Sequence, residues 1–255
     1  MNAIRRLESG CGHVAVIELC RPPHNHVTTA VMGQLSDLAH ELDNDPSVRC
    51  MVLMAEGRVF CAGADFNSEG DQASAADPAA FYEQSLRLFD TRKPIVAAVE
   101  GAAVGAGLGL ALVADFRVTC AEARFSANFT RLGFHPGFGL SVTLPRLVGQ
   151  QQAALLFHTG RRIGGEEAVR VGLADVLASS EQVRTEALAL AQEIATSAPL
   201  AVQSTRATLR TGLSELIRSV NRRELEQQRI HFATADFKEG VAAMSARRTP
   251  QFIGE

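Results

Sequence analysis

The sequence lacks the patterns that mark several large protein classes. Its 255 residues include five scattered cysteines and no Cys-x-x-Cys pair, so metal-site spacing is missing and free thiols in a reducing cytoplasm are favoured. The first ten residues carry two arginines with no apolar stretch of leader length behind them, and no apolar run reaches the roughly 18 residues of a membrane span. The net charge of −3 gives no general attraction to nucleic acid or to an anionic membrane. We therefore expect a cytoplasmic protein whose partners are neither nucleic acid nor membrane.

Core-forming residues, in contrast, are plentiful. Hydrophobic residues make up 46% of the chain, which is enough for one large domain. Runs rich in Val and Ile predict strands over residues 13–19, 48–55 and 95–99. Apolar residues at helical spacing predict a helix over 28–45, with Thr28 or Thr29 as its N-cap, and another over 77–91. This alternation predicts an α/β fold.

The second half of the chain has a different pattern. A Gly-rich loop, LGFHPGFGLS, covers residues 132–141, and helices are predicted over 181–197, 200–211 and 213–234. We predict an α/β core over residues 1–195 and a helical region over 196–255 that packs on the core or on a neighbouring subunit. Small residues at 73–76 suggest a mobile loop.

Two glycine-bearing segments carry the functional information. The first is VFCAGADF at 59–66, where small residues after a β-type run leave backbone N–H groups unpaired. The second is EGAAVGAGLGL at 100–110, which follows a strand and opens a helix whose first N–H groups have no intrahelical acceptor. Close packing of backbone is the structural alternative for both. A nicotinamide or flavin site is disfavoured, because Leu110 breaks the Gly-x-Gly-x-x-Gly spacing.

Several motifs in a fixed order resemble the crotonase (enoyl-CoA hydratase/isomerase) superfamily. They are FCAGADF at 60–66, the strand, turn and helix around 104–109, ADFRVTCAEARF at 114–125, LGFHPGFGLSVTLPRLVG at 132–149 and TADFKEGVAAMSARRTPQF at 234–252. The resemblance implies a crotonase-like spiral of ββα units with a helical C-terminal trimerisation region. It also implies a homotrimer or hexamer acting on an acyl-CoA thioester, with no metal or redox cofactor and with coenzyme A only as part of the substrate.

The resemblance also assigns an oxyanion hole and removes two carboxylates. It implies that the backbone N–H groups of Ala64 and Ala106 hold the thioester oxygen as it gains charge. A family hydratase has glutamates at the positions that are Gly109 and Phe129 here. Hydration needs a base for the water and an acid for the α-carbon, and neither residue can serve. Decarboxylation, hydrolysis or isomerisation then remains.

Other side chains are candidates for the missing chemistry and for substrate binding. His135 in the Gly-rich loop and His231 in the tail are the candidate acids or bases, although each also suits a structural role. The resemblance and the residue types together suggest substrate contacts, several of them to CoA, from Arg21, His24, His26, Ala62, Asp65, Phe66, Tyr82, Phe129 and Arg247.

Two other functions stay open at this point. A catalytically silent acyl-CoA-binding protein would keep the fold without turnover. A hydrolase of a diketone that carries no CoA would not be inhibited by free CoA, because it would have no CoA site.

Overall fold

The computed structural model describes residues 3–10, 12–65 and 77–255. A six-stranded sheet with the order β1-β2-β3-β4-β6-β9 forms its centre. β1 pairs antiparallel to β2, and all later neighbours in this sheet are parallel. The strands are β1 (Ile4–Glu8), β2 (Val14–Leu19), β3 (Cys50–Ala55), β4 (Ile95–Val99), β6 (Phe116–Cys120) and β9 (Val176–Ala178).

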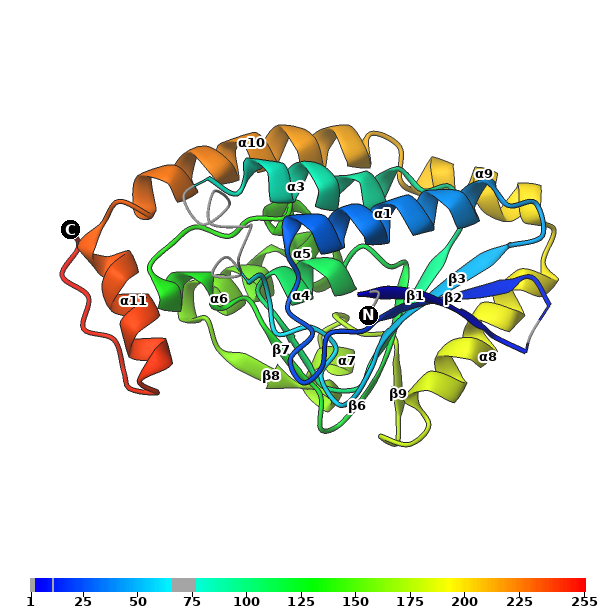
Figure 1. Ribbon diagram of the computed structural model, residues 1–255, viewed down its shortest axis with the longest axis horizontal. Coiled ribbons are helices and arrows are strands. Elements are labelled where there is room, and N and C mark those ends of the chain that lie inside the picture. The colour runs from blue at the N-terminus through cyan, green and yellow to red at the C-terminus, as the bar shows by residue number, and fades with distance from the viewer. Residues whose placement is uncertain (1–2, 11, 66–76) are drawn as a thin grey trace.

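Every residue of β2, β3 and β4 is buried, as expected for parallel strands covered on both faces. Helix α8 (Val183–Thr196) packs against β3, β4 and β6. On the other side lie α1 (Thr29–Asn44) and α3 (Ala79–Leu86), which pack on each other. Figure 1 shows the sheet between these two layers.

A second, three-stranded sheet extends the spiral. It consists of β5 (Ala102–Val104), β7 (Arg124–Ser126) and β8 (Arg162–Gly164), with β5 parallel and β8 antiparallel to β7. The short helices beside it are α4 (Ala106–Ala111), the 3-10 helix η2 (Asn128–Leu132), α5 (Leu140–Val148), α6 (Gln150–Thr159) and α7 (Gly165–Arg170).

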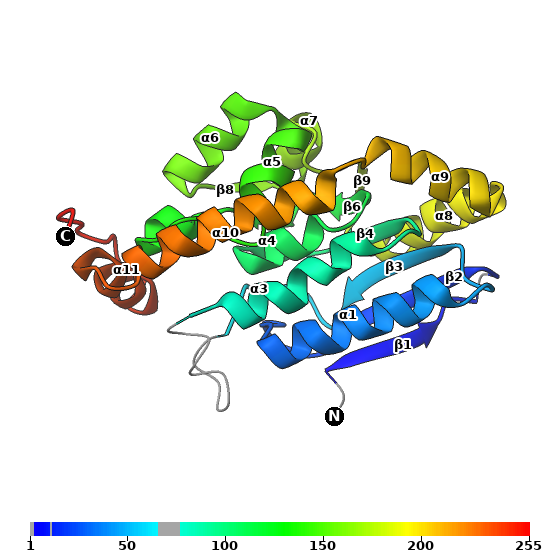
Figure 2. The ribbon, with the colours of Figure 1, turned by 90° about the horizontal axis from the view of Figure 1, so that it is seen from above.

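The last part of the chain is helical: α9 (Pro199–Leu209), α10 (Leu213–His231) and α11 (Ala235–Ser245) follow α8. Viewed from above, α10 crosses the molecule over α4 and α5, while α1 and α3 lie to one side (Figure 2). Asp115 ties α9 to the sheet, since it accepts hydrogen bonds from Arg206 and Arg210 at 2.9 Å. The helical region therefore packs on the core of its own chain.

Most predicted elements are confirmed, with shifted ends. Thr28 caps α1 by accepting the Val31 N–H at 3.3 Å, and Pro199 begins α9. The predicted helix at 77–91 is divided into α3 and the 3-10 helix η1 (Arg87–Asp90). The predicted loop at 73–76 lies outside the described residues. No described helix has the length and apolar character to cross a membrane.

Candidate active site

Residues 61–65 form a bend that aims one backbone N–H away from its neighbours. The Val27 N–H donates to Gly63 O at 3.0 Å, and the Asp65 N–H donates to Val27 O at 2.9 Å. Because successive N–H groups alternate in direction along an extended chain, the N–H of Ala64 points to the side opposite Val27. Gly63, at φ +117°, makes the bend feasible.

The start of α4 lies directly against this bend. The Val104 N–H donates to Cys61 O at 3.0 Å, and a Cβ on Gly107 would lie 2.0 Å from that oxygen. Gly105, at φ +56°, donates its own N–H to Ser126 O. Ala106 is the first residue of α4, so its N–H has no acceptor within the helix. The segments that carry Ala64 and Ala106 are thus in contact.

Aromatic rings pack against α4 and against the glycine that precedes it. A Cβ on Gly109 would lie 2.6 Å from Cγ of Phe138, so that ring fills the space beside Gly109. The ring tip of Phe129 would lie 4.0 Å from a Cβ on Gly105, and its ring packs edge-on against Phe134 at 5.4 Å between centroids. The surroundings of positions 109 and 129 are therefore apolar.

One face of α10 carries four polar residues, of which only His231 was predicted from the sequence. They are spaced 3, 4 and 3 residues apart and comprise Asn221, Glu224, Gln228 and His231; the first three are buried. We call them the α10 polar face. Polar residues at helical spacing inside an Arg- and Glu-rich helix were the available signal.

The α10 polar face holds the loop at residues 133–139. The Glu224 carboxylate accepts the N–H groups of Gly139 at 2.8 Å and Ser141 at 3.0 Å. Gln228 donates to His135 O at 2.8 Å and accepts the Tyr82 hydroxyl at 3.0 Å. The loop is thus fixed at both of its ends.

His135 and His231 lie together, and their hydrogen bonds set their tautomers. His231 Nδ1 accepts the His135 backbone N–H at 3.1 Å, so the neutral His231 ring carries its proton on Nε2. His135 Nδ1 lies 2.7 Å from Pro136 O, and since a carbonyl only accepts, this Nδ1 is protonated and Nε2 is free to accept. Burial and the nearby His135 lower the pKa of His231.

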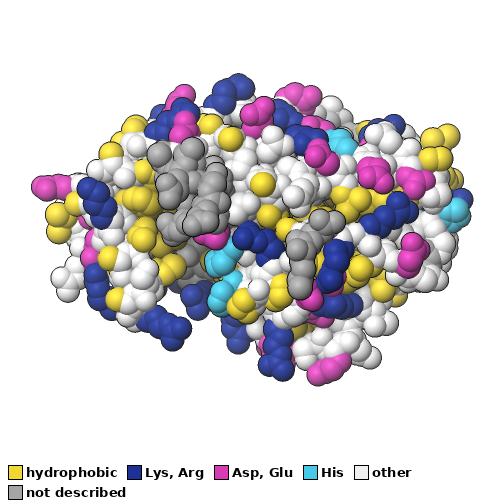
Figure 3. All heavy atoms as spheres, in the orientation of Figure 1, with side chains coloured by type: hydrophobic (Ala, Val, Ile, Leu, Met, Phe, Trp, Pro, Cys, Tyr) yellow, Lys and Arg dark blue, Asp and Glu magenta, His cyan; other side chains and the backbone are white. Residues whose placement is uncertain are grey.

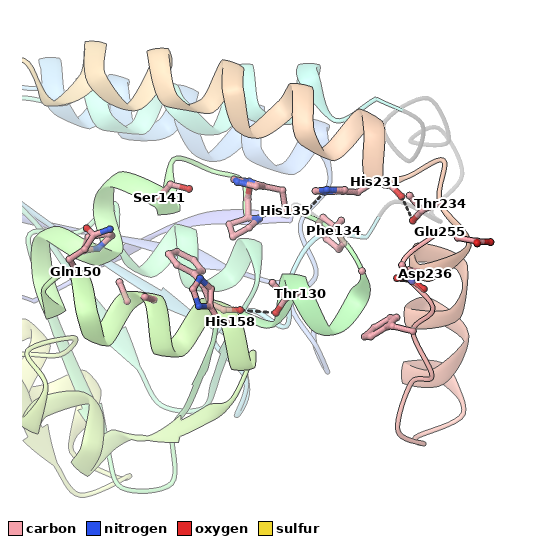
Figure 4. Close-up of a pocket in the computed structure, with 18 residues that line it drawn as sticks. Thr130, Phe134, His135, Ser141, Gln150, His158, His231, Thr234, Asp236 and Glu255 are labelled. Atoms are coloured by element: carbon pink, nitrogen blue, oxygen red, sulfur yellow. Dashed lines mark hydrogen bonds between the residues drawn. The ribbon is translucent and has the colours of Figure 1, made fainter.

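Both histidines line a cavity of about 660 Å³. Figure 4 shows them below α10, with His158 approaching from α6 and Phe134 beneath the pair. Neither Ala64 nor Ala106 lines this cavity. Its wall Phe134 packs on Phe129, which in turn reaches Gly105. The predicted catalytic residues therefore fall into two neighbouring groups separated by two rings.

The loop after β2 brings its predicted binding residues to the bend at 61–65. The Ala62 N–H donates to His24 O at 3.0 Å, His26 Nδ1 lies 3.2 Å from Gly63 O, and Arg21 donates to His26 O at 2.8 Å. Histidine and cationic side chains gather near the middle of the face in Figure 3.

A buried residue that the sequence reasoning missed shapes this loop. Asn25, at φ +50°, accepts the Arg21 N–H and donates to the carbonyls of Glu56 and Val59. Asn is one of the few residues that tolerate this backbone conformation, which was the available clue.

The remaining predicted residues are dispersed. Tyr82 is buried, and burial raises the pKa of its hydroxyl, which is bonded to Gln228. Asp65 is half-buried at the end of the bend. Arg247 is exposed just beyond α11. Phe66 lies outside those residues.

Comparison with known proteins agrees with this architecture. A family model described as enoyl-CoA hydratase/isomerase matches residues 10–255. The chain belongs to this family. Its fold is that of the crotonase superfamily: the crystal structure of an enoyl-CoA hydratase/isomerase from Pseudoalteromonas atlantica T6c has a TM-score of 0.86 and 29% identity, covering 99% of this chain and 100% of the other.

Relatives in the family carry names for different reactions. A probable enoyl-CoA hydratase of Bacillus subtilis is 32% identical, covering 95% of this chain and 96% of its own. The 1,2-epoxyphenylacetyl-CoA isomerase of Escherichia coli is 30% identical, covering 95% of each chain. Because two reaction names occur at almost equal identity, family membership alone does not specify the reaction of this chain.

Proposed function

We propose that this chain is an acyl-CoA enzyme whose thioester oxygen is held by the backbone N–H groups of Ala64 and Ala106. The observation that carries the proposal is the orientation of Ala64, whose flanking residues both bond to Val27 and leave its N–H facing the other way. Ala106 supplies a second N–H without an intrahelical acceptor from the contacting segment. Two such donors stabilise an enolate or tetrahedral oxyanion. Arg21, His24 and His26 adjoin Ala62 and are proposed to contact the CoA moiety.

The reaction proposed is one that forms a charged thioester intermediate without two glutamates. Gly109 and Phe129 offer neither a base nor an acid, and an aromatic ring packs against each position. Decarboxylation, hydrolysis and isomerisation meet this condition, whereas plain hydration does not.

His135 and His231 are proposed to act on the distal part of the acyl group. Their Nε2 atoms offer one acceptor and one donor in the neutral state, which suits proton transfer. The cavity that they line is separated from Ala106 by Phe129 and Phe134. An acyl chain held at Ala64 and Ala106 would reach them only by passing these rings.

Proline at position 106 tests the donor directly. It removes the N–H and suits the first position of a helix, so A106P is expected to fold and to lose about 100- to 1000-fold in kcat. The matched control is A235P, at the first position of α11, which is expected to keep full activity. Equal turnover by A106P and wild type would refute the role of Ala106.

A catalytically silent acyl-CoA-binding protein is the second candidate, and the apolar residues at 109 and 129 favour it. Mass spectrometry of a panel of acyl-CoA substrates after incubation separates the two functions. Turnover that H135A abolishes would exclude the silent protein. Binding of several acyl-CoAs with every substrate recovered unchanged would exclude the enzyme. Failure of free CoA to compete with a bound ligand would instead favour the diketone hydrolase.

A further inference from the structure

The contact between Gly109 and Phe138 is closer than any side chain at position 109 could tolerate. A Cβ built on Gly109 would lie 2.6 Å from Cγ of Phe138 and 2.9 Å from its Cβ and Cδ1. Real Cβ atoms essentially never approach another atom within 3.0 Å. Two of the three close atoms belong to the stem of the phenylalanine, so rotating the ring does not relieve the clash.

Phe138 cannot easily move away. Its side chain is 1% exposed and packs edge-on against Phe81. Its backbone has φ +63°, an unfavourable conformation for a bulky residue, so the surrounding structure must impose it. Glu224 supplies that constraint by binding the N–H groups of Gly139 and Ser141.

The residue before Phe138 is fixed as well. A Cβ on Gly137 would lie 2.0 Å from the Tyr82 hydroxyl oxygen and 2.6 Å from Nε2 of Gln228. The loop is thus pressed between α3, α4 and α10, with glycines at the two positions that flank the ring. The placement of the ring against α4 is consequently set by the whole loop.

We propose that Phe138 is a specificity-determining residue that keeps side chains and water off the face of α4 one turn beyond Ala106. Resting on the proposed function, this means that the ring takes the place of an acid or base on that side of the acyl group. The site is thereby restricted to acyl-CoA reactions that deliver no water from this face of α4, which excludes plain hydration. Replacing Gly109 alone cannot restore a hydratase, since the ring must also leave.

A double-mutant cycle measured by Tm tests the steric conflict between position 109 and Phe138. G109A is expected to lower Tm by about 3 to 8 °C through overpacking, although alanine is the better helix former. In the F138G background, which removes Cβ, Cγ and Cδ1 together and suits φ +63°, the same change is expected to be neutral or stabilising. The matched control is G33A in α1, where a Cβ would meet only ordinary contacts at 3.6 Å or more; its Tm should stay equal or rise. Equal losses for G109A in both backgrounds would overturn the proposal.

An activity comparison tests the specificity part. G109E/F129E is expected to hydrate 2-enoyl-CoA no faster than the reaction without enzyme, whereas G109E/F129E/F138G is expected to be at least about 100-fold faster than that reference. Equal hydration by the two variants, or none by a folded triple variant that binds acyl-CoA, would overturn the proposal. Binding of acyl-CoA by wild type is measured separately. Its absence would refute the proposed function, and the stability cycle would still report on the ring.

Discussion

The candidate site has two parts, called here its two walls, and one presents backbone groups while the other presents side chains. Ala64 and Ala106 face the site with backbone N–H groups, and their orientation depends on main-chain hydrogen bonds. The second wall is the neighbouring loop at 133–139, which contributes side chains and is held in place by the α10 polar face. Ordinary side-chain substitution leaves the first wall intact but can displace the second. If the proposed function holds, substitutions in the loop can change the reaction while the two backbone N–H groups persist.

The largest effect on the second wall is expected when the loop loses its hydrogen bonds to Glu224. E224Q replaces a buried carboxylate oxygen with an NH₂ group that faces the N–H of Gly139 or Ser141. We expect the free energy of unfolding to fall by about 3 kcal/mol, because hydrogen bonds to charged groups contribute about 1.5 to 3 kcal/mol and the donors remain buried. Urea unfolding measures the loss.

The control for E224Q lies two residues away on the same helix. Glu226 is 62% exposed and pairs only loosely with Arg223 at 3.8 Å, so E226Q should change stability by less than about 0.5 kcal/mol. Comparable losses for the two variants would mean that the loop does not depend on Glu224.

The two walls also differ in how far the sequence predicts them. The family's motifs assign Ala64 and Ala106, and the structure brings the two segments that carry them into contact. Phe138 was not predictable, since its contact with Gly109 joins segments 29 residues apart and depends on a φ of +63°. The helical spacing of the α10 polar face could be recognised in the sequence. Its hydrogen-bond partners in and beside the loop could not, because they lie 80 or more residues away.

The same reasoning explains why four later strands were not predicted from the sequence. β6 to β9 are short strands among polar residues, and their pairing with distant strands, which local periodicity does not encode, stabilises them. The strands at 14–19, 50–55 and 95–99 were predictable because both of their faces are buried and all of their residues except Glu18 are apolar.

A smaller loss of stability is expected for Y82F, and it distinguishes a structural role of Tyr82 from contact with the substrate. Y82F removes the hydroxyl that donates to Gln228 at 3.0 Å and leaves that amide oxygen buried. We expect a loss of about 1 to 2 kcal/mol in unfolding free energy. We also expect acyl-CoA affinity within about twofold of wild type. A loss of affinity greater than about tenfold, with the fold intact, would instead make Tyr82 a substrate contact.

The smallest expected effect concerns pH, and it arises at the same wall. The pKa of His231 is lowered from its ordinary value of 6.5 by burial and by His135, so the folded chain keeps the ring neutral where the unfolded chain binds a proton. The contribution of His231 is therefore fully present above about pH 6.5 and is lost as the pH falls through the folded-state pKa. H231N retains an acceptor for the His135 N–H but does not titrate. Unfolding free energies measured from pH 8 to pH 5 should decline less steeply for H231N than for wild type, and parallel curves would show that His231 is not held neutral by its surroundings.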